Sequence, residues 1–339
     1  MQTADGESLG MDSATALFQW ATSSPRRRAM PLMGYPGVRL TGASMKAHLF
    51  NAGLQTRALT ALAERFAPDA LFIFMDLSVE ADALGAPVRY PLHETPTVER
   101  PVLRRPSDLE GLTAEHFLDH CRIQVFLRTL RGLKRSLDLP VGGYVVGPFT
   151  LAGLLMGAAE AAEATLVHPD FLHRVLRFTT SVIDSYLQAQ VEEGADLIAI
   201  LEPSAAFLSP GAFGEFSAAY VAGLVQRCKV PCVLHVCGDA SALIPQMAAT
   251  GVEGLSLDAP VNLPEAARQV DSRVVLIGNI APASVMARGS VSDVERAVQT
   301  LLEAMSGVPN FILSTGCDLP PETPLENIEA FMRIARQAT

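Results

Sequence analysis

Short apolar runs alternate with longer amphipathic stretches along most of the chain. Apolar runs of about four to eight residues between turn residues are typical of buried strands, whereas apolar residues spaced three and four apart are typical of helices. Eight runs fit the strand pattern, and helical sequence follows each of them. The predicted strands cover residues 30–33, 70–75, 141–146, 196–201, 231–236, 254–257, 274–277 and 311–315.

Several helix starts are also visible in the sequence. Ser209 followed by Pro210 predicts a helix start, because Ser caps helices and Pro is favoured in the first turn. The segment from Ser290 to Asp293 and the segment from Thr323 to Glu326 both have the spacing of a capping box. These signals place helices between the predicted strands and after the last one.

The regular alternation of strand and helix predicts a parallel sheet with helices outside it. We predict a single (β/α)8 TIM barrel over residues 30–339, preceded by an N-terminal helical extension over residues 1–29. An open doubly wound sheet is the alternative, but its first strand normally leads into a glycine-rich phosphate-binding turn, which residues 34–37 do not match. Residues 77–112, rich in Pro and charge, predict a long excursion after the second strand that covers part of the barrel mouth.

The composition restricts the location and the partners of the protein. The chain has 339 residues, 49% of them hydrophobic, a formal net charge of −10 and a pI near 5.2. The acidic balance argues against nucleic-acid binding, and no apolar run reaches the ~18 residues that span a bilayer. The acidic start of the chain does not resemble a signal peptide, and five cysteines without disulfide spacing favour reduced thiols. We therefore expect a cytoplasmic protein without nucleic-acid or membrane partners.

Three metal-ligating side chains lie at the ends of two predicted strands. His235 and Cys237 are two residues apart and therefore face the same side, and Cys317 follows the last strand. In a closed barrel the carboxyl ends of the strands form one face, whereas a flat sheet would hold these two ends roughly 14 Å apart at ~4.8 Å per strand. His and Cys with one coordination position left open are typical of catalytic zinc. We predict a zinc site formed by His235, Cys237 and Cys317.

The other three cysteines, Cys121, Cys228 and Cys232, are expected to be buried thiols without a metal role. Five further polar residues near predicted strand ends are candidates for the substrate pocket. These candidates are Tyr35, Asp76, Glu202, Asp258 and Asn279. Three of them, Asp76, Glu202 and Asp258, could instead form a hydrogen bond that orients His235, and for Glu202 and Asp258 a cap or turn role is the alternative.

Several segments resemble the uroporphyrinogen decarboxylase superfamily, and within it the zinc-dependent corrinoid methyltransferases such as methylcobalamin:coenzyme M methyltransferases. The segments are 234–239 (LHVCGD), 277–280 (IGNI), 314–328 (STGCDLPPETPLENI), 147–150 (GPFT) and 76–81 (DLSVEA). The resemblance covers nearly the whole chain. It implies a barrel whose zinc, held by His235, Cys237 and Cys317, serves methyl transfer between a corrinoid and a small thiol. The corrinoid would be presented by a separate carrier protein, because the chain has no second domain for it.

Three alternatives to this function differ in chemistry. The decarboxylase branch has an Arg-rich first loop, FMRQAGRY, that grips a polycarboxylate, whereas residues 30–39 here contain Arg39 alone, so most charge-assisted hydrogen bonds to such a substrate would be lost. In a second alternative, zinc polarises an oxygen, nitrogen or sulfur methyl donor and the methyl group goes to cob(I)alamin. In a third, the barrel binds a corrinoid or thiol as a carrier or sensor. The sequence does not identify the thiol.

Overall fold

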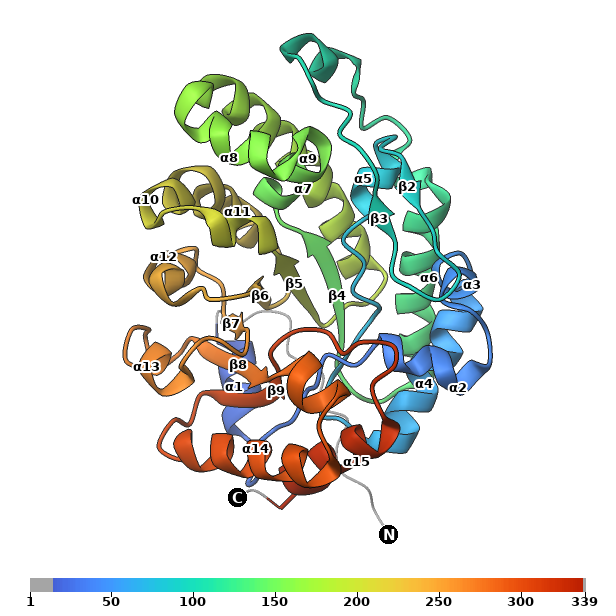
Figure 1. Ribbon diagram of the computed structural model, residues 1–339, viewed down its shortest axis with the longest axis vertical. Coiled ribbons are helices and arrows are strands. Elements are labelled where there is room, and N and C mark those ends of the chain that lie inside the picture. The colour runs from blue at the N-terminus through green and yellow to red at the C-terminus, as the bar shows by residue number, and fades with distance from the viewer. Residues whose placement is uncertain (1–14, 338–339) are drawn as a thin grey trace.

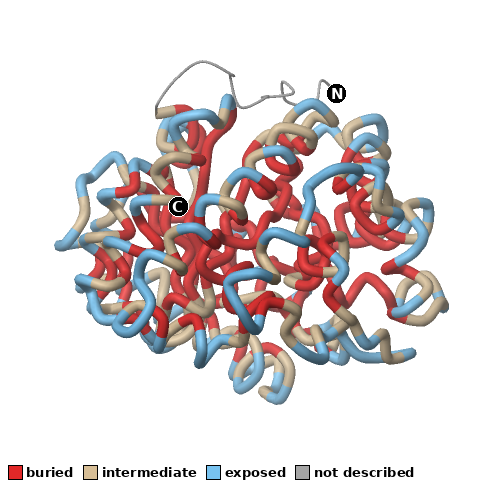
Figure 2. Tube along the Cα trace, turned by 90° about the horizontal axis from the view of Figure 1, so that it is seen from above, coloured by how far each residue is buried: buried red, intermediate tan, exposed pale blue. Residues whose placement is uncertain are grey.

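The computed structural model describes residues 15–337 and shows a curled parallel sheet surrounded by helices (Figure 1). The order of the strands in the sheet follows their order in the chain, as expected for successive strand–helix units. Buried residues gather in the middle of the molecule, inside the helical layer (Figure 2). The strands of this sheet are β1 (Leu71–Phe72), β4 (Val141–Val146), β5 (Leu197–Leu201), β6 (Cys232–Val236), β7 (Gly254–Leu257), β8 (Val275–Ile280) and β9 (Phe311–Thr315).

The segment near residue 29 lies between β9 and β1, where a closed barrel needs its remaining strand. Ala29 forms a parallel bridge with Leu313, and the Met30 N–H donates to the Leu313 carbonyl at 2.9 Å. On the other side, the Asp69 N–H donates to the Ala29 carbonyl at 2.9 Å. The prediction of a regular strand over residues 30–33 is nevertheless wrong. Pro31 has no N–H to donate toward β1, and the Leu32 N–H donates to the Thr315 hydroxyl at 3.0 Å instead of to the β9 backbone, so the ladder ends at this bridge.

The helices cover the outside of the sheet (Figure 1). The seven-residue helix α1 (Ala16–Thr22) lies within the predicted N-terminal extension, of which residues 1–14 lie outside the described residues. The other helices are α2 (Val38–Thr41), α3 (Met45–Leu49), α4 (Ala52–Phe66), α5 (Val79–Ala83), α6 (Cys121–Ser136), α7 (Pro148–Met156), α8 (Ala158–Val167), α9 (Pro169–Glu192), α10 (Pro210–Phe213), α11 (Ala219–Val225), α12 (Ile244–Ala249), α13 (Leu263–Ala267), α14 (Val291–Ala304) and α15 (Leu325–Ala335).

All three predicted helices are present, and the predicted caps of two of them are confirmed. The Ser209 side chain caps α10, and Ser290 and Asp293 form a reciprocal capping box at the start of α14. The capping box predicted at Thr323 is wrong. Pro324 is the N-cap residue of α15, and the buried Thr323 hydroxyl has no hydrogen-bond partner among the described residues. The side chain therefore lies one position too far from the helix to cap it.

The excursion over residues 77–112 contains secondary structure of its own. It begins with α5 and continues into a two-stranded antiparallel hairpin formed by β2 (Val88–Arg89) and β3 (Thr97–Val98). The hairpin tip, residues 93–96, contributes to a pocket together with residues that follow β1 and β9. The excursion therefore reaches the carboxyl face of the sheet, as predicted.

Among residues 15–337, no single helix is long and apolar enough to cross a membrane. Helices α7 and α8 meet such a criterion only when they are counted as one span, although they are bent by 107° at the break between them.

Candidate metal centre and substrate pocket

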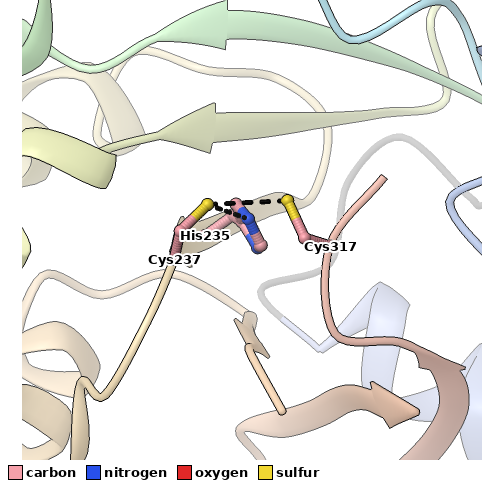
Figure 3. Close-up of side chains that lie close together, drawn as sticks. All are labelled: His235, Cys237 and Cys317. Carbon is pink, nitrogen blue, oxygen red and sulfur yellow. Dashed lines mark hydrogen bonds between the residues drawn. The ribbon is translucent and has the colours of Figure 1, made fainter. Parts of the chain in front are cut away.

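His235, Cys237 and Cys317 converge at the carboxyl ends of β6 and β9 (Figure 3). His235 Nε2 lies 3.1 Å from Cys237 Sγ, and Cys237 Sγ lies 3.5 Å from Cys317 Sγ. One ligand atom from each residue lies within 4.8 Å of the other two. The curvature of the sheet is what brings the two sulfurs together, because the ends of these strands would be far apart in a flat sheet.

The geometry of these three side chains fits a zinc ion. Zinc bonds of about 2.3 Å to sulfur and about 2.0–2.1 Å to imidazole nitrogen, at tetrahedral angles, place neighbouring ligand atoms roughly 3.6–3.8 Å apart. The observed separations of 3.1 and 3.5 Å differ from these values by only a few tenths of an ångström. One imidazole and two thiols are also a typical zinc ligand set.

Two residues of the adjoining strand β7 and its loop hold the ligands in place. Ser256 Oγ lies 3.0 Å from His235 Nδ1, which leaves Nε2 directed toward the sulfurs. Asp258 accepts a 2.8 Å hydrogen bond from the Gly238 N–H, and Gly238 follows Cys237 with a φ of +80°. Asp258 therefore fixes the turn that carries Cys237, whereas the hydrogen bond that orients the imidazole comes from Ser256.

Burial and close approach shift the pKa values of Cys317 and His235. Hydrogen bonding to Cys237 and burial raise the pKa of the Cys317 thiol. Burial opposes protonation of His235, but Cys317 and Asp258 outweigh it and raise the pKa of the imidazole. Sulfur binds a metal as the thiolate, and two thiolates this close to each other repel. A zinc ion bound between them would offset that repulsion with its positive charge.

The structure places Glu202 at the start of helix α7. Its carboxylate accepts hydrogen bonds from the Phe149 and Thr150 N–H groups at 3.0 and 2.9 Å. The hydroxyls of Thr150 and Ser217 add bonds of 2.7 and 3.2 Å. Burial raises the pKa of Glu202 to about 6. The carboxylate is thus occupied in capping the helix, the alternative that the sequence had left open.

The side chain of Asn279 is held by hydrogen bonds to the backbone of the loop after β7. Its side-chain amide donates to the carbonyls of Asp258 and Val261 at 2.9 and 2.7 Å. It borders a pocket formed with α13 and α14 rather than the one that holds Tyr35 and Asp76. These contacts favour a role in holding the loop after β7.

Asp76 lies in a buried ionic network just beyond β1. It pairs with Arg122 of α6, and it accepts bonds of 2.9 and 2.7 Å from the N–H and hydroxyl of Ser78. Arg122 also contacts Asp82 and Tyr90 of the excursion at 3.4 and 3.3 Å. The network therefore connects the barrel to the excursion. Removal of either charge from a buried ion pair is strongly destabilising, because the other charge is then buried without a partner.

A pocket of about 540 Å³ lies beside the metal centre, between the excursion and the loop after β9. Tyr35 lines it, and its hydroxyl donates to the Met75 carbonyl. Asp318, the residue after Cys317, lines it as well. Burial raises the pKa of Asp318 well above its usual range, with a further contribution from Cys317. The structure thus brings Tyr35, Asp76 and Asp318 to one pocket next to the predicted zinc ligands.

Two residues near this site were not found from the sequence. Ser256 orients His235, and its only signal was a polar residue within an apolar strand. Tyr144 of β4 is buried and stacks on Phe72 with ring centroids 4.7 Å apart. Burial raises the pKa of Tyr144, and the charges of Asp318 and Cys317 add to this effect.

The remaining cysteines differ in exposure. Cys232 is buried as predicted, and Cys228 is partly buried. The prediction that Cys121 is buried is wrong, because this residue is exposed at the first position of α6. None of the three belongs to the group of metal-ligating side chains found among residues 15–337.

The fold and the site place the protein among the parallel α/β barrels that carry a candidate metal centre at the carboxyl ends of their strands. The model of the uroporphyrinogen decarboxylase (URO-D) family matches residues 24–338. The chain therefore belongs to the URO-D family.

Relatives within this family have two kinds of activity in their names. The chain is 31% identical to methylcobamide:CoM methyltransferase MtbA of Methanosarcina mazei, over 79% of both chains. It is 30% identical to uroporphyrinogen decarboxylase of Methylobacillus flagellatus, over 84% of this chain and 82% of the relative. The solved structure of a methyltransferase from Methanosarcina mazei matches the fold with a TM-score of 0.87, covering 96% of this chain and 99% of that chain at 24% identity.

Proposed function

We propose that this protein is a zinc-dependent methyltransferase that moves a methyl group between a corrinoid and a small thiol. The observation that carries the proposal is the convergence of His235, Cys237 and Cys317, which fits zinc and leaves one coordination position for a substrate atom. The similarity to a methylcobamide:CoM methyltransferase supports the same chemistry.

Each residue of the centre has a specific role in this proposal. His235, Cys237 and Cys317 would hold zinc, which when bound keeps a thiol deprotonated near neutral pH. Ser256 orients the imidazole, and Asp258 fixes the turn after Cys237. The sulfur of the acceptor takes the methyl group from methylcob(III)alamin, and the electron pair of the Co–C bond stays on cobalt as cob(I)alamin. The thiol proton leaves to solvent when the thiol binds.

The corrinoid is proposed to lie over the carboxyl ends of the strands, presented by a separate carrier protein. The metal centre and the excursion both lie at this face, so we expect a large planar cofactor to approach the acceptor sulfur from this side. A cytoplasmic location is part of the same proposal, since the five cysteines are free thiols.

Decarboxylation of a porphyrinogen is the less favoured function, although decarboxylases are among the relatives. Arg39 is exposed, and its guanidinium donates to the Thr323 carbonyl at 3.0 Å. Arg122 is buried and paired with Asp76. Arg122 is therefore not available to bind the carboxylates of a polyanionic substrate, and Arg39 is a single guanidinium where several charge-assisted hydrogen bonds would be needed.

The test combines metal analysis with a transfer assay. We expect one zinc per chain and formation of a methyl thioether from free methylcobalamin and a thiol, followed by the absorbance of cob(I)alamin. Cys317→Ala should lose both the metal and the activity, whereas Cys121→Ser, a matched change at an exposed cysteine, should keep both. Full zinc content in Cys317→Ala would contradict the metal site.

A transfer of methyl groups from ethers or amines to cob(I)alamin, without any transfer to thiols, would favour the opposite reaction, in which the corrinoid is the methyl acceptor. In that case a methyl donor would occupy the open coordination position. Binding of a corrinoid or thiol without turnover in either direction would favour a carrier or sensor.

A further inference from the structure

We propose that Tyr144 binds the acceptor thiol, and that its phenol hydroxyl donates a hydrogen bond to an oxygen at the end of the thiol away from the sulfur. This inference rests on the proposed function, because it concerns the substrate of the same site. The feature that carries it is a buried phenol inside the barrel whose hydroxyl has no partner among the described residues.

Tyr144 lies on the inner face of the sheet, which also carries His235. The register pairs Tyr144 with Ala199 of β5, and Ala199 with Val233 of β6. Val233 and His235 are two residues apart and therefore face the same side. His235 meets Cys317, which follows a strand three positions away in the sheet, so this side is the concave one (Figure 3).

Contacts on the two faces of β4 agree with this orientation. Gly143 has no room for a side chain on the outer face, because a Cβ there would lie 2.0 Å from Gln190 Oε1 of helix α9. On the inner face, a Cβ at Gly142 would lie 2.2 Å from the ring of Phe72. The same ring stacks on Tyr144 with the centroids 4.7 Å apart. Phe72 and Tyr144 therefore form an aromatic wall inside the barrel.

The hydroxyl of Tyr144 faces open space rather than a protein group. The residue as a whole is only 6% exposed. Its hydroxyl forms no hydrogen bond within the part of the chain that the structure describes, and the oxygen is not fully enclosed. Buried tyrosine hydroxyls normally have a hydrogen-bond partner. Burial raises the pKa of Tyr144, so the phenol keeps its proton at neutral pH and is available as a donor.

This open space leads toward the metal centre, because helix α1 covers the opposite end of the barrel. Gly254 of β7 pairs with Val233 and therefore lies at the same level as Tyr144. A Cβ at Gly254 would lie 2.9 Å from Leu17 Cδ2 of α1, and the Leu17 N–H donates to Glu253 at 3.0 Å. We therefore expect a ligand of Tyr144 to enter from the carboxyl face, where the candidate metal ligands lie.

Tyr144 and His235 are close enough for one small molecule to contact both. Their levels in the sheet differ by two residues, roughly 6.6 Å at ~3.3 Å per residue, and their strands are separated by two spacings of ~4.8 Å. The two Cα atoms are thus roughly 12 Å apart along the sheet, and both side chains extend into the space between them. Ala199 lies between them and leaves this space open, because its side chain is a single methyl group. A thiol with a two-carbon chain and its sulfur beside His235 would extend toward the phenol.

The experiment compares Tyr144→Phe with the wild type for two thiols of nearly equal size, 2-mercaptoethanol and 1-propanethiol. The substitution keeps the ring that stacks on Phe72 and removes only the hydroxyl, whereas 1-propanethiol has a methyl group in place of the hydroxyl of the ligand. Binding of each thiol to the zinc-loaded protein is measured by calorimetry, and methyl transfer from methylcobalamin gives kcat and KM in parallel. Tyr186→Phe is the matched control, because Tyr186 is another buried tyrosine, which packs against Phe117 from helix α9 outside the sheet.

We expect Tyr144→Phe to weaken the binding of 2-mercaptoethanol by about three- to tenfold, the usual net effect of one neutral hydrogen bond, and to leave that of 1-propanethiol unchanged. KM for 2-mercaptoethanol should rise by the same factor while kcat stays within about twofold, because the hydrogen bond is equally present before and during methyl transfer. The control should leave the ratio of the two affinities unchanged, and the zinc content should be the same in all three proteins.

An equal loss for both thiols would show that Tyr144 only supports the structure of the site, and no loss for either would show that its hydroxyl does not contact the thiol. Both results would overturn the inference and leave the proposed methyl transfer intact. A loss confined to 2-mercaptoethanol, in a protein that transfers no methyl group, would support the inference and contradict the proposed function. Absence of thiol binding to the zinc-loaded wild type would contradict both.

Discussion

Ser256→Ala should weaken zinc binding although Ser256 is not a metal ligand. Its hydroxyl lies 3.0 Å from His235 Nδ1, and both side chains are buried. The hydrogen bond fixes the ring so that Nε2 lies toward Cys237 and Cys317. Removal of the hydroxyl leaves a buried imidazole nitrogen without this partner and lets the ring rotate.

The size of the effect follows from the burial of this hydrogen bond. Loss of one partner of a buried hydrogen bond costs about 1–3 kcal/mol. Hydrogen bonds of this kind to a metal-ligating His typically change metal affinity by about 10–100-fold. Because 1.4 kcal/mol corresponds to about tenfold, the two estimates agree. We expect a 10–100-fold loss of zinc affinity.

The assay is competition for zinc against a chelator of known affinity at constant pH. Ser217→Ala is the matched control, because it removes another buried hydroxyl, one that donates to Glu202 and not to His235. That variant should lose some stability and keep its zinc affinity. Equal zinc affinity of Ser256→Ala and the wild type would refute the reasoning that Ser256 positions the ligand.

Three further predictions concern the fold. Chelation of the metal should abolish activity and leave the circular dichroism spectrum nearly unchanged. The reason is that the proposed ligands lie at strand ends, whereas the hydrophobic core does not depend on them. Cooperative unfolding on chelation would instead show that the zinc is structural. Glu202→Ala should lower the free energy of unfolding, measured in urea titrations, by about 3–5 kcal/mol. The substitution leaves buried N–H and hydroxyl donors of α7 and Ser217 without an acceptor. A loss below about 1 kcal/mol would contradict the capping role. Burial raises the pKa of Glu80 from 4.5 to about 8, so its contribution to stability is fully present below about pH 4.5 and is lost as the pH rises through about 8. Glu80→Gln should reduce the fall in unfolding free energy across this range by about 5 kcal/mol, and an unchanged slope would show that Glu80 does not titrate there.

The fold class, and the convergence of His235, Cys237 and Cys317, could be predicted from the sequence alone. Alternation of apolar runs with amphipathic stretches is a local pattern, and it predicted the parallel sheet in the order observed. The two-residue spacing of His235 and Cys237 sets their common side, and closure of the barrel then brings Cys317 to them. The first strand, predicted over residues 30–33, is reduced to a single bridge at Ala29, because neither Pro31 nor Leu32 continues the ladder.

The contacts of the other polar residues depend on tertiary packing and could not be predicted. Glu202, Asp76 and Asp258 all follow predicted strands, yet one caps α7, one pairs with Arg122 and one holds the turn after Cys237. Ser256 became recognisable only once β6 and β7 were in register, which places it opposite His235. The physical reason is that the period of a strand determines which side a residue faces, whereas the partner it meets there depends on the neighbouring strand and helix, which are distant in the sequence.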